Sequence, residues 1–146
     1  MKAITFHNLF EVKIAVGRMG DDGTVRKVKE TYVVNAVSFA DAENRVFLEI
    51  GDVNRIAEVL TIVRAPYKEV FFLDNDDDEA SWYKVKVAMI ILDEQADKER
   101  KSSVYYLVQG SSLANALANV DTVMRSSMID YVSASGSETN VCDIFK

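Results

Sequence analysis

The chain opens with alternating apolar and polar positions, then turn residues, then a second β-prone run. The apolar residues from Phe10 to Val16 are separated by single residues that are mostly polar or small. This period of two is typical of a strand with one buried face. Turn residues occupy 20–23, and the stretch 27–34 is rich in Val, Thr and Tyr. The pattern predicts a β-hairpin.

A helical pattern follows the predicted hairpin. Ser38 can cap a helix, and Asp41 lies where its carboxylate favours the positive end of the helix dipole. Apolar residues then recur at helical spacing up to Gly51, a natural stop. The stripe consists of Phe39, Ala42, Val46, Phe47 and Ile50.

The second half reads in the same order. A hairpin is predicted over 82–92 and 104–108 with a charged turn at 94–101, and a helix over 113–125 with Ser112 as its cap. Each helix is followed by β-prone sequence, at 59–63 and 70–72 in the first half and at 129–134 and 141–145 in the second. Pro66 and Gly136 are expected to bend the chain between these closing strands.

These parallels indicate an internal duplication. Residues 10–16 resemble 83–89, and residues 32–46 resemble 106–120. We predict one α+β domain, 1–146, made of two pseudo-symmetric β-β-α-β(-β) repeats at about 8–73 and 81–146. Mainly antiparallel sheet would carry two packed helices. The seam at 73–81 contains the acidic run 74–79, which we expect to be a solvated linker.

The reactive side chains are few. The chain has one Cys and one His, so a zinc or thiolate cluster and most hydrolase triads lack their residues. Asp74, Asp76 and Asp78 alternate as in a calcium loop, but the required glycine and bidentate glutamate are missing. We expect no catalytic residue, metal or cofactor, and therefore no enzyme. His7 and Cys142 are expected to be structural.

No apolar run has the length of a signal peptide or of a membrane span, which predicts a cytoplasmic protein with no membrane partner. The net charge is −6, which argues against a surface that is basic throughout but permits a local basic face.

The clearest candidate site is a nucleic-acid-binding surface on the second hairpin. Trp82, Lys84 and Lys86 alternate on one strand and therefore share a face. An aromatic ring can stack on a base while ammonium groups neutralise phosphates. The other candidate residues are Lys13, at the repeat position of Lys86, then Lys27 and Lys29 on the partner strand, and Tyr105 beside them. Together they could form one basic track across both halves.

A simpler interpretation stays open. The lysines would then be ordinary solvated residues of a strand, and Trp82 would cover the edge of the core. Tyr32 and Tyr106 occupy equivalent positions, which packing in a duplicated core alone would produce.

The second half also carries a recognisable pattern, which the first half extends. The matching residues are Trp82, Lys84, Lys86, Leu92, Asp93, Glu94, Lys98, Glu99, Arg100, Tyr105, Tyr106, Leu107, Val108, Gln109, Met128, Ile129, Asp130, Tyr131, Val132 and Ser133, with Phe10, Glu11, Lys13, Glu30, Tyr32, Val34, Ala36, Ser38, Phe39, Ala42 and Glu43 in the first half. Over nearly its whole length the chain resembles the uncharacterised family called domain of unknown function 4494, typical of gut anaerobes and their tailed phages.

The resemblance implies a bacterial cytoplasm, that of the host if the protein is phage-encoded. It associates phage-encoded relatives with single-stranded DNA binding, and it implies no catalytic residue. We therefore expect a non-enzymatic single-stranded DNA-binding protein. The alternative is a protein-protein interaction or assembly module of a phage or host, acting through a sheet face or edge. A homo-oligomer stays open in either case.

Overall fold

The computed structural model describes residues 1–54, 56–75 and 77–146. Strands dominate, and two helices accompany them, which confirms the α+β class. The elements, in chain order, are β1 (Lys2–Thr5), β2 (Leu9–Met19), β3 (Val25–Asn35), α1 (Phe39–Asn54), β4 (Ile56–Arg64), β5 (Tyr67–Phe72), β6 (Ser81–Asp93), β7 (Lys98–Gly110), α2 (Leu113–Met124), β8 (Tyr131–Glu138) and β9 (Val141–Phe145).

The chain forms two compact units, neither of which is a continuous half of the sequence. Unit 1 contains Met1–Phe6 and Tyr67–Thr139, and unit 2 contains His7–Pro66 and Asn140–Lys146. The backbone therefore passes three times from one unit to the other. The predicted seam at 73–81 lies inside unit 1 and does not divide the units.

Unit 2 is a four-stranded sheet in the order β4-β2-β3-β9, with α1 packed on one face. The predicted hairpin is present, because β2 and β3 pair antiparallel along their whole length. Gly23 closes the turn with φ of 80°, a conformation that favours glycine. The apolar face predicted from the alternation is the core, which consists of Phe10, Val12, Ile14, Val16, Tyr32, Val34, Ala36, Ala42, Val46 and Ile50.

Helix α1 begins as the sequence predicts. The Asp41 backbone N–H donates to Ser38 Oγ at 3.1 Å, and the Asp41 carboxylate accepts from the Val37 N–H at 2.9 Å. These bonds satisfy backbone donors at the helix N-terminus. The regular helix ends at Gly51, as the sequence predicts, because the torsions there are non-helical. A second short helical stretch follows this kink and extends to Asn54.

Unit 1 is a five-stranded sheet in the order β1-β5-β7-β6-β8, with α2 packed on one face. Ser112 caps α2 as predicted, accepting the Asn115 N–H at 3.1 Å. At Gly110 the helix backbone comes so close that an added Cβ would lie 3.0 Å from the Ala116 nitrogen. The core of this unit consists of Phe71, Tyr83, Val85, Val87, Met89, Tyr106, Val108, Ala116, Val120 and Met124.

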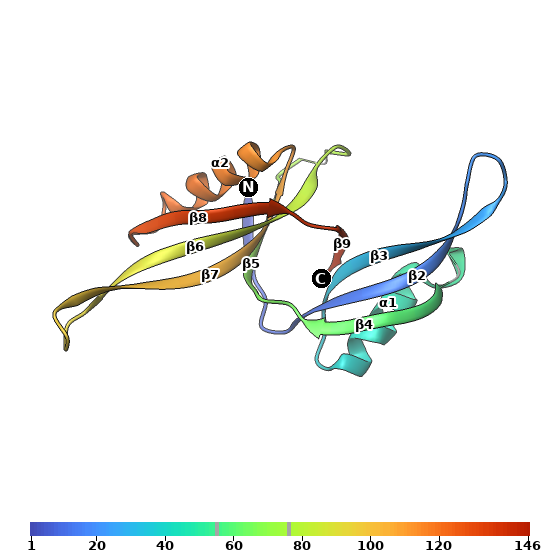
Figure 1. Ribbon diagram of the computed structural model, residues 1–146, viewed down its shortest axis with the longest axis horizontal. Helices are drawn as coiled ribbons and strands as arrows, with labels where there is room; N and C mark the ends of the chain where they lie inside the picture. Colours follow the sequence, from blue (N-terminus) through green and yellow to red (C-terminus); the bar gives the residue numbers. More distant parts are fainter. Residues whose placement is uncertain (55, 76) are drawn as a thin grey trace. The chain divides into compact units, whose positions relative to one another are not determined.

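Each unit contains one strand that comes, in the sequence, directly after a strand of the other unit. β5 comes directly after β4 of unit 2, yet it pairs parallel with β7 of unit 1. β9 comes after β8 of unit 1, yet it pairs parallel with β3 of unit 2. Figure 1 shows β9 beside β3, and β5 beside β7. Each hairpin thus receives an exchanged parallel strand, while descent of the halves from one ancestral unit stays a prediction.

Three local expectations were wrong or incomplete. Gly136 does not bend the chain but lies inside β8, paired with Val85. The second hairpin turn is shorter than 94–101, because β7 already begins at Lys98. Strand β1 was not predicted at all. Among the described residues, no helix combines the length and the apolar character needed to cross a membrane.

Candidate nucleic-acid interface

The sheet of unit 1 has one face covered by α2 and an opposite face that carries the candidate residues. Tyr83 and Val85 belong to the core with α2. Because side chains alternate along a strand, Trp82, Lys84 and Lys86 lie on the opposite face of β6, as the sequence predicts. Tyr105 of β7 is directly opposite Lys86 and shares this face. The structure therefore brings all four unit 1 candidates together.

Lys84 and Lys86 are half-buried, and their neighbours in the sheet carry no charge. On β7 they face Leu107 and Tyr105. On β8 they face Ser137 and Ser135. Between described residues, no ion pair involves either ammonium group. Two lysines two residues apart on a strand lie about 7 Å from each other, so two ammonium groups of like charge are close together on this face.

The Lys84 ammonium lies over the ring of Tyr105, with 4.5 Å from Nζ to the ring centroid. This is a cation-π contact, worth about 0.5–1 kcal/mol at an exposed site. The contact fixes both side chains on the same face. Tyr105 is half-buried.

Trp82 has a different role from the one that the sequence suggested. Its side chain is only 6% exposed. Its ring meets Phe72 edge to face, with 5.5 Å between centroids and an interplanar angle of 84°. The indole therefore packs within unit 1, and the expectation of a free stacking surface at Trp82 is corrected. This position agrees with the simpler interpretation of the sequence, in which Trp82 covers the edge of the core.

Unit 2 gathers three further candidates on the face of its sheet opposite α1. Lys13, Lys27 and Lys29 are all exposed. Lys13 lies between the core residues Val12 and Ile14, and Lys29 and Lys27 pair with Ala15 and Gly17, which share the face of Lys13 on β2. An ion pair joins Lys27 Nζ to Glu58 Oε1 at 3.9 Å, between two exposed side chains, which is a weak contact. A continuous basic track across both units stays a prediction.

Sequence reasoning missed the hydroxyl groups beside the unit 1 lysines. Ser135 and Ser137 are exposed on β8, opposite Lys86 and Lys84. A hydroxyl can donate to an anionic oxygen and so complement an ammonium group. The available signal is the alternation of serines over 133–137, but the predicted β-prone stretch ends at 134 and a bend is predicted at Gly136. We call Lys84, Lys86, Tyr105, Ser135 and Ser137 the lysine-serine face.

Unit 2 also contains an ion-pair and hydrogen-bond network around Glu30. Glu30 accepts hydrogen bonds from Arg18 Nε at 2.6 Å, from an Arg18 terminal nitrogen at 2.9 Å and from the Tyr32 hydroxyl at 2.6 Å. The bond from Arg18 holds the pKa of Glu30 below its usual value. Burial, together with the Glu30 bond, raises the pKa of Tyr32. The network ties β2 to β3 and has a structural role.

The acidic run is only partly described, because Asp76 lies outside the described residues. Asp74 pairs with the amino group of Met1, and Asp77 accepts the Glu79 backbone N–H at 2.9 Å. His7 and Cys142 are exposed. Within the described ranges, no three His, Cys, Asp or Glu side chains are grouped as metal ligands would be.

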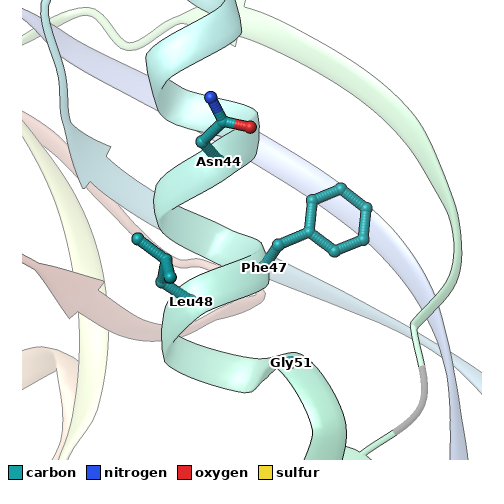
Figure 2. A pocket seen from close by; sticks show the side chains of 4 residues that line it. All are labelled: Asn44, Phe47, Leu48 and Gly51. Carbon is teal, nitrogen blue, oxygen red and sulfur yellow. The ribbon is translucent and has the colours of Figure 1, made fainter.

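A shallow apolar hollow lies on α1, lined by Asn44, Phe47, Leu48 and Gly51 (Figure 2). Figure 2 shows Phe47 and Leu48 extending to different sides of the helix. None of the four described lining residues has an ionisable side chain. It therefore adds no acid, base or cation to the candidate site.

Comparison with known proteins identifies a family but no characterised relative. No curated protein matches the chain, and no solved structure matches it. A family model matches residues 8–146, which include every candidate residue named above. The chain belongs to the family described as Domain of unknown function (DUF4494).

Proposed function

We propose that the protein binds single-stranded nucleic acid, with single-stranded DNA as the preferred ligand, through the lysine-serine face of unit 1. The observation that supports this function is the pair Lys84 and Lys86, half-buried among uncharged neighbours. A phosphodiester would relieve the repulsion between the two ammonium groups. When the lysines neutralise phosphates, the nucleic acid also releases its condensed counterions, which favours binding.

The chemistry of the face fits a single strand. The two lysines follow one line along β6, so they can neutralise successive phosphates of an extended backbone. Ser135 and Ser137 flank that line and can donate hydrogen bonds to phosphate oxygens. Tyr105 offers ring surface for a base, and base stacking on an aromatic side chain contributes about 1–3 kcal/mol per base. None of these contacts reads base sequence, so binding should tolerate sequence change.

Fluorescence anisotropy with labelled oligo-dT of about 30 nucleotides tests the proposal. The double variant Lys84→Ala/Lys86→Ala should bind at least about tenfold more weakly. Its slope of log affinity against log salt should fall by about 1.4, because two phosphate contacts are lost. The matched control is Lys98→Ala/Lys101→Ala, which removes two exposed lysines from the same hairpin. This control should change the affinity by less than about twofold, as expected for charges outside the contact.

Two results would contradict the proposal. The first is a lack of binding by the wild-type protein at low salt. The second is an equal loss of affinity in both double variants, which would mean that net charge alone drives association. Urea unfolding of both variants verifies that neither has lost its fold.

A second candidate function is protein interaction through the end of the β2–β3 hairpin. Met19 and Val25 are directly opposite each other and are 74% and 60% exposed. Exposed apolar side chains in contact with each other are typical of interaction surfaces. If this function holds, Met19→Ser/Val25→Ser should abolish association with a partner or second copy in light scattering and leave DNA binding unchanged.

A further inference from the structure

We propose that the outer edge of β9 is a docking position for an extended segment of a partner protein, which would pair antiparallel with β9. This inference does not depend on the proposed nucleic-acid function. It rests on a comparison of the two exchanged strands. In unit 1 the outer edge of β5 pairs with β1, whereas among the described residues no strand pairs with the outer edge of β9.

The two exchanged strands are seated in the same way. Asp143, Ile144 and Phe145 pair with Tyr32, Val33 and Val34. Glu69, Val70 and Phe71 pair with Tyr106, Leu107 and Val108. In both ladders a register shift precedes these three pairs. An acidic residue, a β-branched residue and a phenylalanine therefore occupy the same three positions in each unit.

The aromatic contacts confirm this correspondence. Phe145 stacks on Tyr32, with 5.1 Å between ring centroids. Phe71 stacks on Tyr106, with 4.9 Å between centroids. Because both the backbone register and the ring contacts agree, the outer edge of β9 matches the outer edge of β5 residue by residue.

In unit 1 this edge holds β1. The strand pairs antiparallel with β5, and Ile4 is opposite Val70 while Thr5 is opposite Glu69. The Thr5 hydroxyl donates to Glu69 Oε1 at 3.0 Å. The side chains of β1 are largely exposed, so the edge accepts this strand through backbone pairing and the Thr5–Glu69 contact, while the preceding Met1 amino group pairs with Asp74. The outer edge of β5 could therefore accept many different sequences, provided that they adopt an extended conformation.

In unit 2, β9 is the last strand of its sheet as far as the described residues show. Asp143 takes the place of Glu69, and its Oδ1 accepts the Ile144 N–H at 2.8 Å. A charged side chain that satisfies a donor of its own strand is a common protection of an exposed edge. An incoming strand must replace the bond from the Ile144 N–H to the Asp143 carboxylate. A hydroxyl or ammonium group opposite Asp143 would bind the released carboxylate and so offset the loss of that bond.

These features define the occupant. It is a short extended peptide with no proline, with an apolar β-branched residue opposite Ile144 and a hydroxyl or basic residue opposite Asp143. The protein's net charge of −6 also favours a basic partner segment. The sequence of β1 satisfies this pattern, which makes residues 1–7 a suitable probe.

The experiment titrates synthetic peptides with blocked ends into the full chain and follows its backbone amides by NMR. The probes have the sequence of residues 1–7 with Thr5→Lys, Thr5→Glu or Ile4→Pro. Wild-type protein should bind the Thr5→Lys peptide about three- to fivefold more tightly than the Thr5→Glu peptide, with shifts centred on 142–145. The Ile4→Pro peptide, which lacks a backbone donor at that position, should not bind.

The charge swap tests the register. Asp143→Lys changes an exposed residue, and the variant should prefer the Thr5→Glu peptide by a similar factor. Cys142→Ser is the matched control, since it alters the adjacent exposed residue and should preserve the wild-type preference.

Three outcomes would overturn the proposal. One is the absence of amide shifts in β9 with any peptide. Another is the same peptide preference in wild type and Asp143→Lys. The third is a set of shifts confined to β1 and β5, which would show exchange with the chain's own first strand. Self-association without peptide, with protection of β9, would assign the edge to a second copy and would equally contradict it.

Discussion

The ring of Phe145, near the end of the chain, stacks on the ring of Tyr32 in the first hairpin, with 5.1 Å between centroids and 14° between planes. The contact holds the exchanged strand β9 on the core of unit 2. Its counterpart in unit 1 joins Phe71 to Tyr106. Residues distant in sequence therefore determine the stability of each hairpin.

Replacing Phe145 should destabilise unit 2. Phe145→Ala should lower the free energy of unfolding by about 1–3 kcal/mol, because it removes the stack and part of the buried apolar surface. The measurement is urea unfolding followed by circular dichroism. Cys142→Ser, on the exposed side of the same strand, should change the free energy by less than about 0.5 kcal/mol. Equal effects of the two substitutions would mean that β9 contributes no packing.

Glu30→Gln should lower stability at neutral pH by about 1 kcal/mol, a value reduced because Arg18 is 38% exposed. The folded state depresses the pKa of Glu30. The stabilisation is therefore complete above the unfolded pKa of about 4.3 and is lost as the pH falls through the folded pKa. Unfolding of both proteins from pH 7 to pH 3 should show their difference shrinking only below about pH 4.3.

The Glu58→Gln variant serves as its control. Glu58 faces Lys27 at 3.9 Å, and both side chains are more than half exposed. Its removal should change stability by less than about 0.5 kcal/mol at every pH. A Glu30→Gln difference that is independent of pH would contradict the assignment of the Arg18 contact to the ionised carboxylate.

Gly110→Ala should cost about 2 kcal/mol of unfolding free energy, since the new Cβ would meet the backbone of α2 at Ala116, which cannot move alone. Gly136→Ala should cost less than about 1 kcal/mol. Its Cβ would meet the ends of the Leu113 and Leu117 side chains at 3.0 and 3.3 Å, and Val85 Cγ2 at 3.8 Å, so the close contacts are with flexible side chains and not with backbone. Thermal unfolding of both variants gives the comparison, and the reverse order would refute this account of the two glycines.

Trp82 should act on stability and not on nucleic-acid affinity. Trp82→Ala should destabilise the protein by about 3 kcal/mol or more, because it empties a buried site against Phe72. Trp82→Phe keeps an aromatic side chain there, and its affinity for oligo-dT should stay within about twofold of wild type. A large loss of affinity in a stably folded Trp82→Phe variant would indicate that the indole stacks on a base after all.

Local elements were predictable because their signals lie within short stretches of sequence. The alternation before and after Gly23 predicts the first hairpin, and Ser38 and Ser112 predict both helix starts. The exchange of β5 and β9 was not predictable, because the choice of a strand's neighbour depends on long-range pairing. Gly136 was misread for a similar reason, since the close approach of α2 to β8 is invisible in local sequence.

The candidate site was predicted in part. Strand alternation predicts that Lys84 and Lys86 lie on one face of the sheet, and the structure confirms this placement. Burial could not be predicted for Trp82, because it arises from Phe72 on β5, a strand that reaches unit 1 by exchange. The serines opposite the lysines also required the antiparallel register of β6 with β8. Features set by register or by strand order were the ones that sequence reasoning missed.

The exchanged strands have a consequence for synthesis on the ribosome. The first hairpin and α1 leave the exit tunnel early, but the strand that completes their sheet is translated only after all of the strands of unit 1. Unit 2, whose hairpin and helix are translated before most of unit 1, is therefore finished last, and until then the edge of β3 stays unpaired in the nascent chain. Such an edge invites wrong pairings, so a ribosomal pause before residue 141 should increase aggregation, and faster translation of that region should reduce it.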